Sequence, residues 1–418
     1  MLQLSPRVKG HIQEVAIFTK WVLYACAIGI LVGAVAVAFH LGIDWATAIR
    51  AANPWVVWLL PFGGASIVLL YRICGMEKDR GTNLVLVAVR EAQPLKLRTA
   101  PLIFLATIIT HLVGGSAGRE GAALQLGGSL SAYIGRKIGL DEKDSRMMVM
   151  CGMAAAFSAL FGTPLTAAVF AMEVVSVGVM YYAAMVPCLV SALVGLMVAE
   201  LCGLGAHGYE ITGIPGLSAL SMFQVGALGV LCAVLSIWFC KAMHAAPKLY
   251  AKYQPEPLLR ATTGGMLILL LTIIVQSQDY NGAGDALIRR MLAGEDIPEA
   301  FLLKILFTAV TLGAGFRGGE IVPILCTGAA FGTLMGPMLG LSQSFGGAVG
   351  MVAVFCGGTN CPLSAMLLSY ELFGGEGVAL YALACGISYM LSGYYGLYSE
   401  QKIVYSKFKT EWVDRKTK

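Results

Sequence analysis

The sequence predicts an all-α integral membrane protein, from its composition and from the length of its apolar segments. Of its 418 residues, 57% are hydrophobic and 13% are charged, whereas soluble domains carry about 25% charged residues. The mean hydropathy of +0.76 means that much of the folded surface needs lipid as its solvent. We expect about eleven apolar segments, near 15–40, 54–73, 99–113, 147–175, 181–201, 217–243, 262–275, 300–315, 321–341, 345–372 and 378–391.

Several of these segments are shorter than the roughly 20 residues that an upright membrane-spanning helix requires, and many contain glycine. Short, interrupted helices are typical of transporters, whose binding sites lie where helices break. The eleven cysteines do not indicate a metal or disulfide framework, because many lie inside apolar segments and no Cys-x-x-Cys pair occurs. We therefore expect no metal and no cofactor.

Both ends of the chain carry basic residues beside apolar segments. Arg7, Lys9 and Lys20 accompany the first segment, and six basic residues lie between positions 402 and 418. Because basic residues favour the cytoplasmic side, we expect both termini in the cytoplasm of a multi-pass plasma-membrane protein. No cleavage site stands out after the first segment, so we expect it to be retained. The net charge of +5 then reflects topology, and no nucleic-acid partner is expected.

Two blocks of sequence recur in the same order. The first block, Gly115 to Glu120, aligns with Gly315 to Glu320 at an offset of 200. The second, Pro164-Leu165 followed by Glu173, aligns with Pro362-Leu363 followed by Glu371 at an offset of 198. This predicts an internal duplication, and the repeated Glu173 and Glu371 indicate a shared role that is either structural or part of an aqueous vestibule.

The duplication predicts one transmembrane domain made of two membrane repeats, 1–205 and 206–418. Transporters built from such repeats place their ion sites where the halves meet near the middle of the bilayer. An odd number of crossings in each half inverts the second half relative to the first. We therefore expect an inverted repeat with broken, tilted helices.

Glu120 is the residue to which we assign the central role. It stands between Gly118 and Gly121 and precedes an apolar run, and ionisable groups at membrane depth are costly and tend to be functional. A helix that begins here directs free N–H groups and its positive dipole end at an anion. A carboxylate at this position can occupy the anion-binding position and can leave it once it is protonated. The alternative is that Glu120 caps its own helix or pairs with Arg119.

Glu320 is the repeat partner of Glu120. Gly319 before it and Pro323 after it mark a helix entrance, where the amides of Ile321 and Val322 could face an ion. The alternative is a glutamate that only caps the helix.

Two further stretches are candidates for the anion site. Gly81, Thr82 and Asn83 open another apolar stretch, where Thr82 or Asn83 could cap a helix while nearby amides close the site. Tyr398 follows the last apolar segment, and its hydroxyl can donate to an anion. The alternative for Tyr398 is a tyrosine of the membrane interface.

Four motifs resemble those of the CLC chloride channels and proton-coupled anion exchangers. They span about residues 80–400 and are, in order, Gly118-Arg119-Glu120-Gly121, Phe161-Gly162-Thr163-Pro164-Leu165, Gly319-Glu320-Ile321-Val322-Pro323 and Tyr398. The resemblance implies a CLC-type inverted repeat and a homodimer in which each subunit has its own pathway. It also implies that Glu120 is the gating glutamate and that the Tyr398 hydroxyl belongs to the central anion site.

Departures from the chloride-transporting members are similar to the fluoride-exporting branch, CLC-F, whose members carry Gly-Arg-Glu-Gly-Thr, Gly-Asn-Asn-Leu and Gly-Gly-Glu-Val-Thr-Pro. Within these motifs Ala122, Thr82 and Val322 replace a Thr, an Asn and a Thr of the branch. The internal proton-transfer glutamate of the chloride exchangers falls on Val174. The branch implies that Glu320 takes part in the proton route.

The sequence therefore predicts a CLC-type antiporter that exports fluoride in exchange for protons, with no cytoplasmic CBS domains after the last span. The alternatives are a chloride/proton exchanger and a passive, voltage-gated-type chloride channel. An intramembrane enzyme is not expected, because no nucleophile–base or metal set is recognisable, and a scaffold would leave the repeated glutamates unexplained. The expected partners are a small anion, protons, the lipid bilayer and a second copy of the chain.

Overall fold

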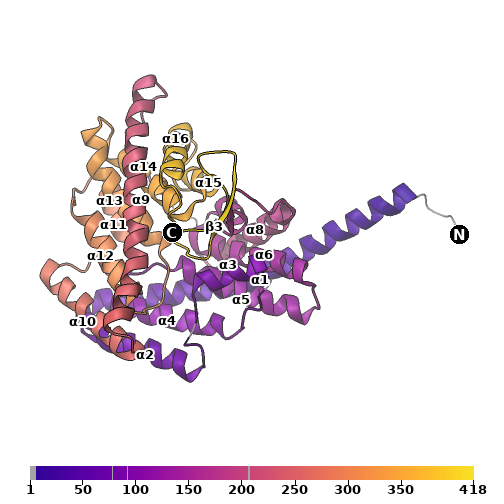
Figure 1. Ribbon diagram of the computed structural model, residues 1–418, viewed down its shortest axis with the longest axis horizontal. Helices are drawn as coiled ribbons and strands as arrows, with labels where there is room; N and C mark the ends of the chain where they lie inside the picture. Colours follow the sequence, from indigo (N-terminus) through magenta and orange to yellow (C-terminus); the bar gives the residue numbers. More distant parts are fainter. Residues whose placement is uncertain (1–5, 78, 92, 206–207) are drawn as a thin grey trace.

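Helices account for most of the chain in the computed structural model, which describes residues 6–418 except 78, 92 and 206–207 (Figure 1). Up to residue 205 the elements are α1 (Pro6–Ala52), η1 (Pro54–Leu59), α2 (Leu60–Ile73), α3 (Thr82–Glu91), α4 (Thr99–Val113), α5 (Glu120–Lys137), α6 (Glu142–Phe161), α7 (Pro164–Glu173), β1 (Ser176–Val177), η2 (Tyr182–Ala184) and α8 (Met185–Leu201). From residue 208 they are α9 (Ala219–Tyr253), α10 (Pro257–Val275), α11 (Asp285–Leu292), α12 (Ala300–Gly313), α13 (Ile321–Met338), α14 (Gln343–Thr359), α15 (Pro362–Phe373), α16 (Val378–Leu391), β2 (Lys402–Tyr405) and β3 (Trp412–Lys416).

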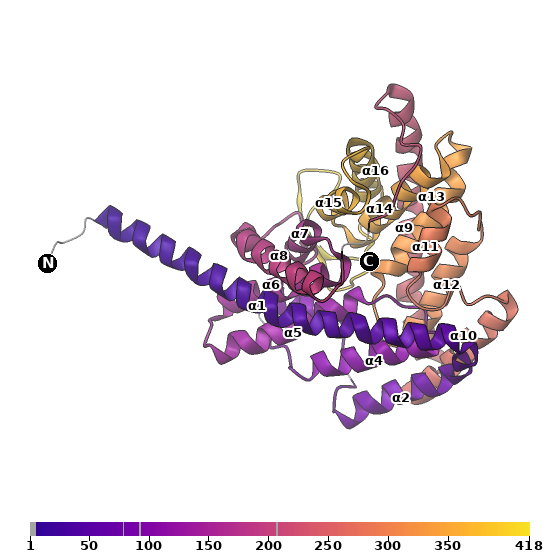
Figure 2. The same cartoon turned by 180° about the vertical axis from the view of Figure 1, so that it is seen from behind.

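Six helical segments of the described chain are long and apolar enough to cross a membrane, and four shorter apolar helices accompany them. The predicted segments 99–113 and 378–391 coincide with α4 and α16. Two helices are longer than predicted, since α1 covers 47 residues and α9 covers 35. Their charged ends lower the local hydropathy without ending the helix. Figure 2 shows the N-terminal part of α1 projecting well beyond the other helices.

Two of the predicted segments are wrong, because 147–175 and 345–372 are each two helices. The first breaks between α6 and α7, where Gly162 adopts a left-handed conformation with φ 70° and Pro164 begins the next helix. The second breaks in the same way at Asn360, with φ 60°, and Pro362. A proline in the first turn is compatible with a new helix but cannot continue the old one. The apolar windows hid both breaks, because the flanking residues are equally apolar.

Equivalent helix pairs pack closely in the two halves of the fold. Helix α5 packs on α6 and α13 packs on α14. A side chain added at Gly127 of α5 would strike the carbonyl of Gly152 in α6, and one added at Gly328 of α13 would strike that of Gly350 in α14. Helices approach this closely in membrane proteins where small residues line the contact. The glycines thus bring α5 and α13 into position, although α5 lay outside the predicted apolar segments.

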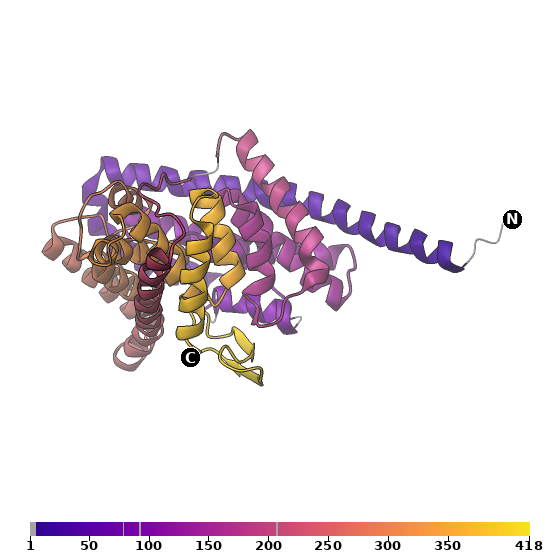
Figure 3. The same ribbon diagram turned by 90° about the horizontal axis from the view of Figure 1, so that it is seen from above.

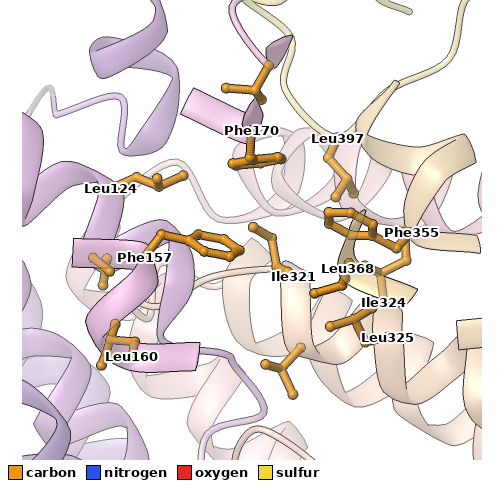
Figure 4. Packing of buried hydrophobic residues seen from close by; sticks show 14 of the residues in the cluster. Leu124, Phe157, Leu160, Phe170, Ile321, Ile324, Leu325, Phe355, Leu368 and Leu397 are labelled. Carbon is orange, nitrogen blue, oxygen red and sulfur yellow. The ribbon is translucent and has the colours of Figure 1, made fainter. Parts of the chain in front are cut away.

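An apolar core joins the two halves (Figure 4). The ring of Phe170 in α7 lies 5.3 Å from that of Phe157 in α6 and 6.0 Å from that of Phe355 in α14. Ile321, at the start of α13, is completely buried in the same cluster. The predominantly α-helical, inverted-repeat fold expected from the sequence is confirmed, with a small three-stranded sheet added to it.

The C-terminal segment packs against the first half of the fold. Strand β2 pairs in parallel with β1, which directly follows α7, and antiparallel with β3. Figure 3 shows β2 and β3 at the edge of the helical body. This small sheet fixes the segment that carries Tyr398.

Candidate functional site

The two helix breaks meet through their backbones. Gly118 and Gly319 form an isolated antiparallel bridge in which each amide donates to the other carbonyl at 2.7 Å. Helix α5 begins at Glu120 and α13 at Ile321, so two helix N-termini start beside this bridge. A Cβ on Gly319 would lie 2.5 Å from the amide nitrogen of Gly121. Glycine is therefore required where the two halves touch.

The carboxylate of Glu120 reaches across to the other half. Its side chain is fully buried, and Oε2 accepts a hydrogen bond from the Val322 amide at 3.3 Å. Oε1 has no hydrogen-bond partner among the described residues. The carboxylate thus lies at the N-terminus of α13, where free amides and the helix dipole favour negative charge.

Neither simple alternative for Glu120 describes this geometry. The carboxylate of Glu120 accepts a hydrogen bond from the Val322 amide of α13, so its role is not limited to capping its own helix. The Arg119 guanidinium lies 3.6 Å from the Asp44 carboxylate and 3.5 Å from the ring nitrogens of His40. His40 in turn contacts Asp44 at 3.0 Å. Arg119 is therefore held by side chains of α1.

The N-terminus of α3 joins the other two. Thr82 is buried, and its hydroxyl donates to the Gly121 carbonyl at 3.3 Å. Gln125, one turn into α5, donates through Nε2 to the same carbonyl at 3.1 Å and to the Thr82 hydroxyl at 3.4 Å. The buried Oε1 of Gln125 has no partner in the part of the chain that the structure describes. Sequence reasoning missed Gln125, although an amide inside a run of small apolar residues was a usable signal.

Gly81 and Asn83 have supporting positions. Gly81 adopts φ 62°, and its amide donates to the Asp79 carboxylate at 2.7 Å. The side chain of Asn83 accepts a hydrogen bond from the Glu400 amide at 3.0 Å. The bonds of Thr82 and Asn83 therefore go to other segments, and Asn83 ties α3 to the C-terminal segment.

Tyr398 and Glu320 lie on another side of the same site. Tyr398 is 2% exposed, so the alternative of an interfacial tyrosine is wrong. Its hydroxyl has no hydrogen-bond partner within the described chain. Glu320 precedes the first residue of α13 and is partly exposed. The structure thus leaves the buried phenol of Tyr398 as a free donor and places Glu320 at the entrance of α13.

A polar network lies beside Val174. Gln401 donates to the carbonyls of Val174 and Thr359 at 2.9 and 2.8 Å, and it accepts from Asn360 at 2.9 Å. Lys407 donates to the Asn360 side chain and, at 3.0 Å, to the Ser392 hydroxyl. Burial lowers the pKa of Lys407 to about 8. Sequence reasoning missed this network, because the C-terminal segment resembles a simple basic tail.

Glu173 and Glu371 have reciprocal structural roles. Glu371 accepts from the amides of residues 165 and 166 at 2.8 and 2.9 Å, which caps α7. Glu173 accepts from the amides of residues 363 and 364 at 3.1 and 2.9 Å and from the Ser364 hydroxyl at 2.6 Å, which caps α15. Each helix thus carries the cap of the other, and of the two roles left open the structure supports the structural one.

A cavity of about 390 Å³ leads to the break from the side of α1. Its walls include Arg119, Asp44 and His40, and it extends to Val322, whose amide binds Glu120. Arg50, which is 8% exposed, also lines it and donates to the His111 carbonyl. Three arginines and three aspartates line this cavity, so groups of both charges border the approach to Glu120.

Comparison with known proteins gives this geometry a context. Residues 62–393 match the family described as voltage gated chloride channel. The chain is 35% identical over 398 residues to the chloride/fluoride channel protein of Pseudomonas syringae pv. tomato, covering 93% of this chain and 87% of that protein. A solved CLC-type fluoride/proton antiporter matches with a TM-score of 0.88 and 29% identity, covering 92% of this chain and 98% of that one. A slow cyanobacterial Cl⁻/H⁺ antiporter shares the fold with a TM-score of 0.73 at 17% identity, over 89% of this chain and 94% of that one.

Broken helices that meet between two inverted halves, with a buried carboxylate at a helix N-terminus, are typical of membrane transporters. The matches above show that the chain belongs to the CLC family of voltage gated chloride channels. It is a multi-pass membrane protein and a CLC-family anion transporter.

Proposed function

We propose that the chain is a proton-coupled antiporter that exports fluoride, with Glu120 as both gate and proton carrier. The observation that carries the proposal is the hydrogen bond from the Val322 amide to a fully buried Glu120 carboxylate. A carboxylate here occupies a place that suits a small anion. When Glu120 takes up a proton it loses its negative charge and can leave, so that an anion replaces it.

Fluoride is the proposed substrate because of the donors around this position and because of the likeness to a fluoride/proton antiporter. Fluoride is small and strongly hydrated, so several donors must replace its water. The amides of Ile321 and Val322 and the free hydroxyl of Tyr398 supply such donors. Protonated Glu120 can add one more.

The remaining site residues complete the proposal. The glycines 118, 121 and 319 allow close backbone approach, and Gly81 adopts the left-handed conformation of its turn. Thr82 and Asn83 position the N-terminus of α3, and Arg119 lines the cavity that leads toward Glu120. We place the proton route through Glu320, because Val174 supplies no carboxyl group. The protein would act as a homodimer in a bacterial inner membrane, with repeats 1–205 and 206–418 and both termini cytoplasmic.

The second candidate is a passive chloride channel, and Val174 is the observation that favours it. A channel needs no internal proton-transfer glutamate, and Val174 is buried and apolar. A chloride/proton exchanger of the usual kind is less compatible with Val174 for the same reason.

Purified protein in liposomes, followed with fluoride, chloride and proton electrodes, separates these functions. We expect fluoride efflux to drive protons in the opposite direction. We also expect fluoride efflux to be faster than chloride efflux. Glu120→Gln should abolish proton movement, whereas Glu210→Gln, which changes an exposed loop residue, should leave it unchanged. Chloride efflux faster than fluoride efflux would overturn the substrate, and proton movement that survives Glu120→Gln would overturn the mechanism.

A further inference from the structure

An apolar groove lies on the outside of the helical body, away from Glu120. It has a volume of about 700 Å³ and lies between the last turns of α9, the middle of α10 and the second half of α12. Its walls are formed mainly by Ala246, Leu249, Leu267, Leu306, Ala309 and Val310. Leu249, Leu267 and Leu306 are exposed in the isolated chain. We call this cavity the α9 groove.

One end of the α9 groove is cationic. Lys248 and Lys252 both line it, and their spacing of four residues puts them on one face of α9. Neither has an ion pair among the described residues, and Lys252 lies 5.3 Å from the ring centre of Tyr253. The buried hydroxyl of Tyr250, which also lines the groove, has no hydrogen-bond partner there. The groove therefore combines apolar walls with unused donors at its rim.

The position of this rim matches the headgroup layer of a membrane. Helix α9 has 35 residues, which gives a length of about 52 Å and exceeds the roughly 30 Å of the hydrocarbon core. Near the same end, His244 contacts the Leu397 carbonyl at 3.0 Å, and Lys241 lies 5.1 Å from the ring centre of Tyr395. The rim is thus close to the basic C-terminal segment, and basic residues mark the membrane face that meets anionic lipid.

We propose that the α9 groove binds one phospholipid with an anionic headgroup. An acyl chain would lie along Leu267, Leu306 and Val310, and the phosphate would lie between Lys248 and Lys252. A soluble anion would leave the apolar walls unused, and a zwitterionic lipid would leave the net positive charge of the rim unbalanced. The site makes no contact with Glu120, so it is independent of the proposed antiport.

Helix α12 gives such a lipid a structural consequence. A Cβ on Gly313, at the end of α12, would lie 2.7 Å from Ala246 of α9, so the two helices touch beside the groove. Helix α12 leads directly into the break that ends at Glu320. A bound lipid would hold α9 against α12, and the delipidated protein should therefore gain thermal stability when the lipid is returned.

Native mass spectrometry of the delipidated, detergent-purified protein tests the proposal, with phosphatidylglycerol and phosphatidylcholine of equal chain length as probes. We expect phosphatidylglycerol to bind more tightly. The double variant Lys248→Gln/Lys252→Gln should weaken its binding roughly thirtyfold and leave phosphatidylcholine binding unchanged. Lys241→Gln is the matched control, because Lys241 lies on the same helix but does not line the groove.

A second pair of variants tests the apolar part. Leu306→Trp should fill the groove and displace both lipids, whereas Leu302→Trp, one turn earlier on α12 and also exposed, should not. Equal binding of phosphatidylglycerol by the wild type and the double lysine variant would overturn the proposal. So would full displacement of the lipid by soluble glycerol phosphate, because the site would then recognise a phosphate alone.

Discussion

The breaks before α5 and before α13 share one backbone design but hold their glutamates differently. Gly118 and Gly319 bond to each other symmetrically at 2.7 Å, and a glutamate follows each of them within two residues. Glu120 is the first residue of its helix and is fully buried, with a hydrogen bond to the opposite half. Glu320 precedes the first residue of its helix and remains partly exposed. The duplication therefore supplies two carboxyl groups, of which Glu120 is the one bonded to the opposite half among the described residues.

The glycine at position 319 explains much of the difference between Glu120 and Glu320. The first motif has Arg119 where the second has Gly319. Arg119 points away from the bridge to Asp44 and His40, whereas Gly319 leaves room for the amides of Glu120 and Gly121 to approach. With no side chain at position 319, the carboxylate of Glu120 can reach the Val322 amide. Among the described residues, Glu320 makes no corresponding hydrogen bond to an amide of α5.

Replacing each glutamate by glutamine should separate the two roles, and this is the largest expected effect. Glu120→Gln should reduce coupled proton flux in liposomes to background, because the buried proton carrier is lost. Glu320→Gln should slow proton flux by roughly a hundredfold, as for loss of a general acid or base, while anion flux continues. Equal proton and anion losses in Glu320→Gln would show that Glu320 supports the fold and not the proton route.

Gly319→Ala tests whether the bridge itself is required. The added Cβ would lie 2.5 Å from the Gly121 amide nitrogen, against backbone that cannot easily move. We expect a loss of about 1–3 kcal/mol in the free energy of unfolding, measured by denaturant titration in detergent. The control is Gly386→Ala in α16, where an added Cβ meets no atom within 4 Å. That variant should be neutral or slightly more stable.

The reciprocal caps of α7 and α15 give a second comparison between the halves, with a smaller effect. Glu173 is buried and accepts three hydrogen bonds, whereas Glu371 is more exposed and accepts two. Glu173→Gln should cost about 2 kcal/mol and Glu371→Gln about 1 kcal/mol, because bonds to a charged group are lost. Thermal melts of the purified variants should show a larger loss of stability for Glu173→Gln than for Glu371→Gln. A larger loss for Glu371→Gln would contradict this account.

Tyr398→Phe should have the smallest effect on stability. The hydroxyl has no partner among the described residues, so its removal breaks no hydrogen bond of the fold, and the unfolding free energy should change by less than about 1 kcal/mol. Anion affinity should fall, measured as a rise in the fluoride concentration that gives half-maximal flux. A strong loss of stability with unchanged flux would place the hydroxyl in the fold and not in the anion site.

Much of this site could be predicted from sequence because its chemistry is local. The recurring blocks around Glu120 and Glu320, with their glycines, predicted two helix breaks, and both occur where expected. Gln125 and the network of Gln401 with Asn360 were missed. Their roles depend on partners tens to hundreds of residues away, and periodicity carries no information about such contacts.

By itself the sequence determined the membrane solvent, the helical class, the duplication and the positions of the two breaks. These follow from composition and short-range pattern, because hydropathy, glycine and proline act on the chain within a few residues. Only the tertiary structure decided that Glu120 binds the amide of Val322, that Arg119 turns to α1, and that α7 and α15 cap each other. Those outcomes depend on how closely glycine lets two distant backbones approach, and that distance is set by the packing of whole helices.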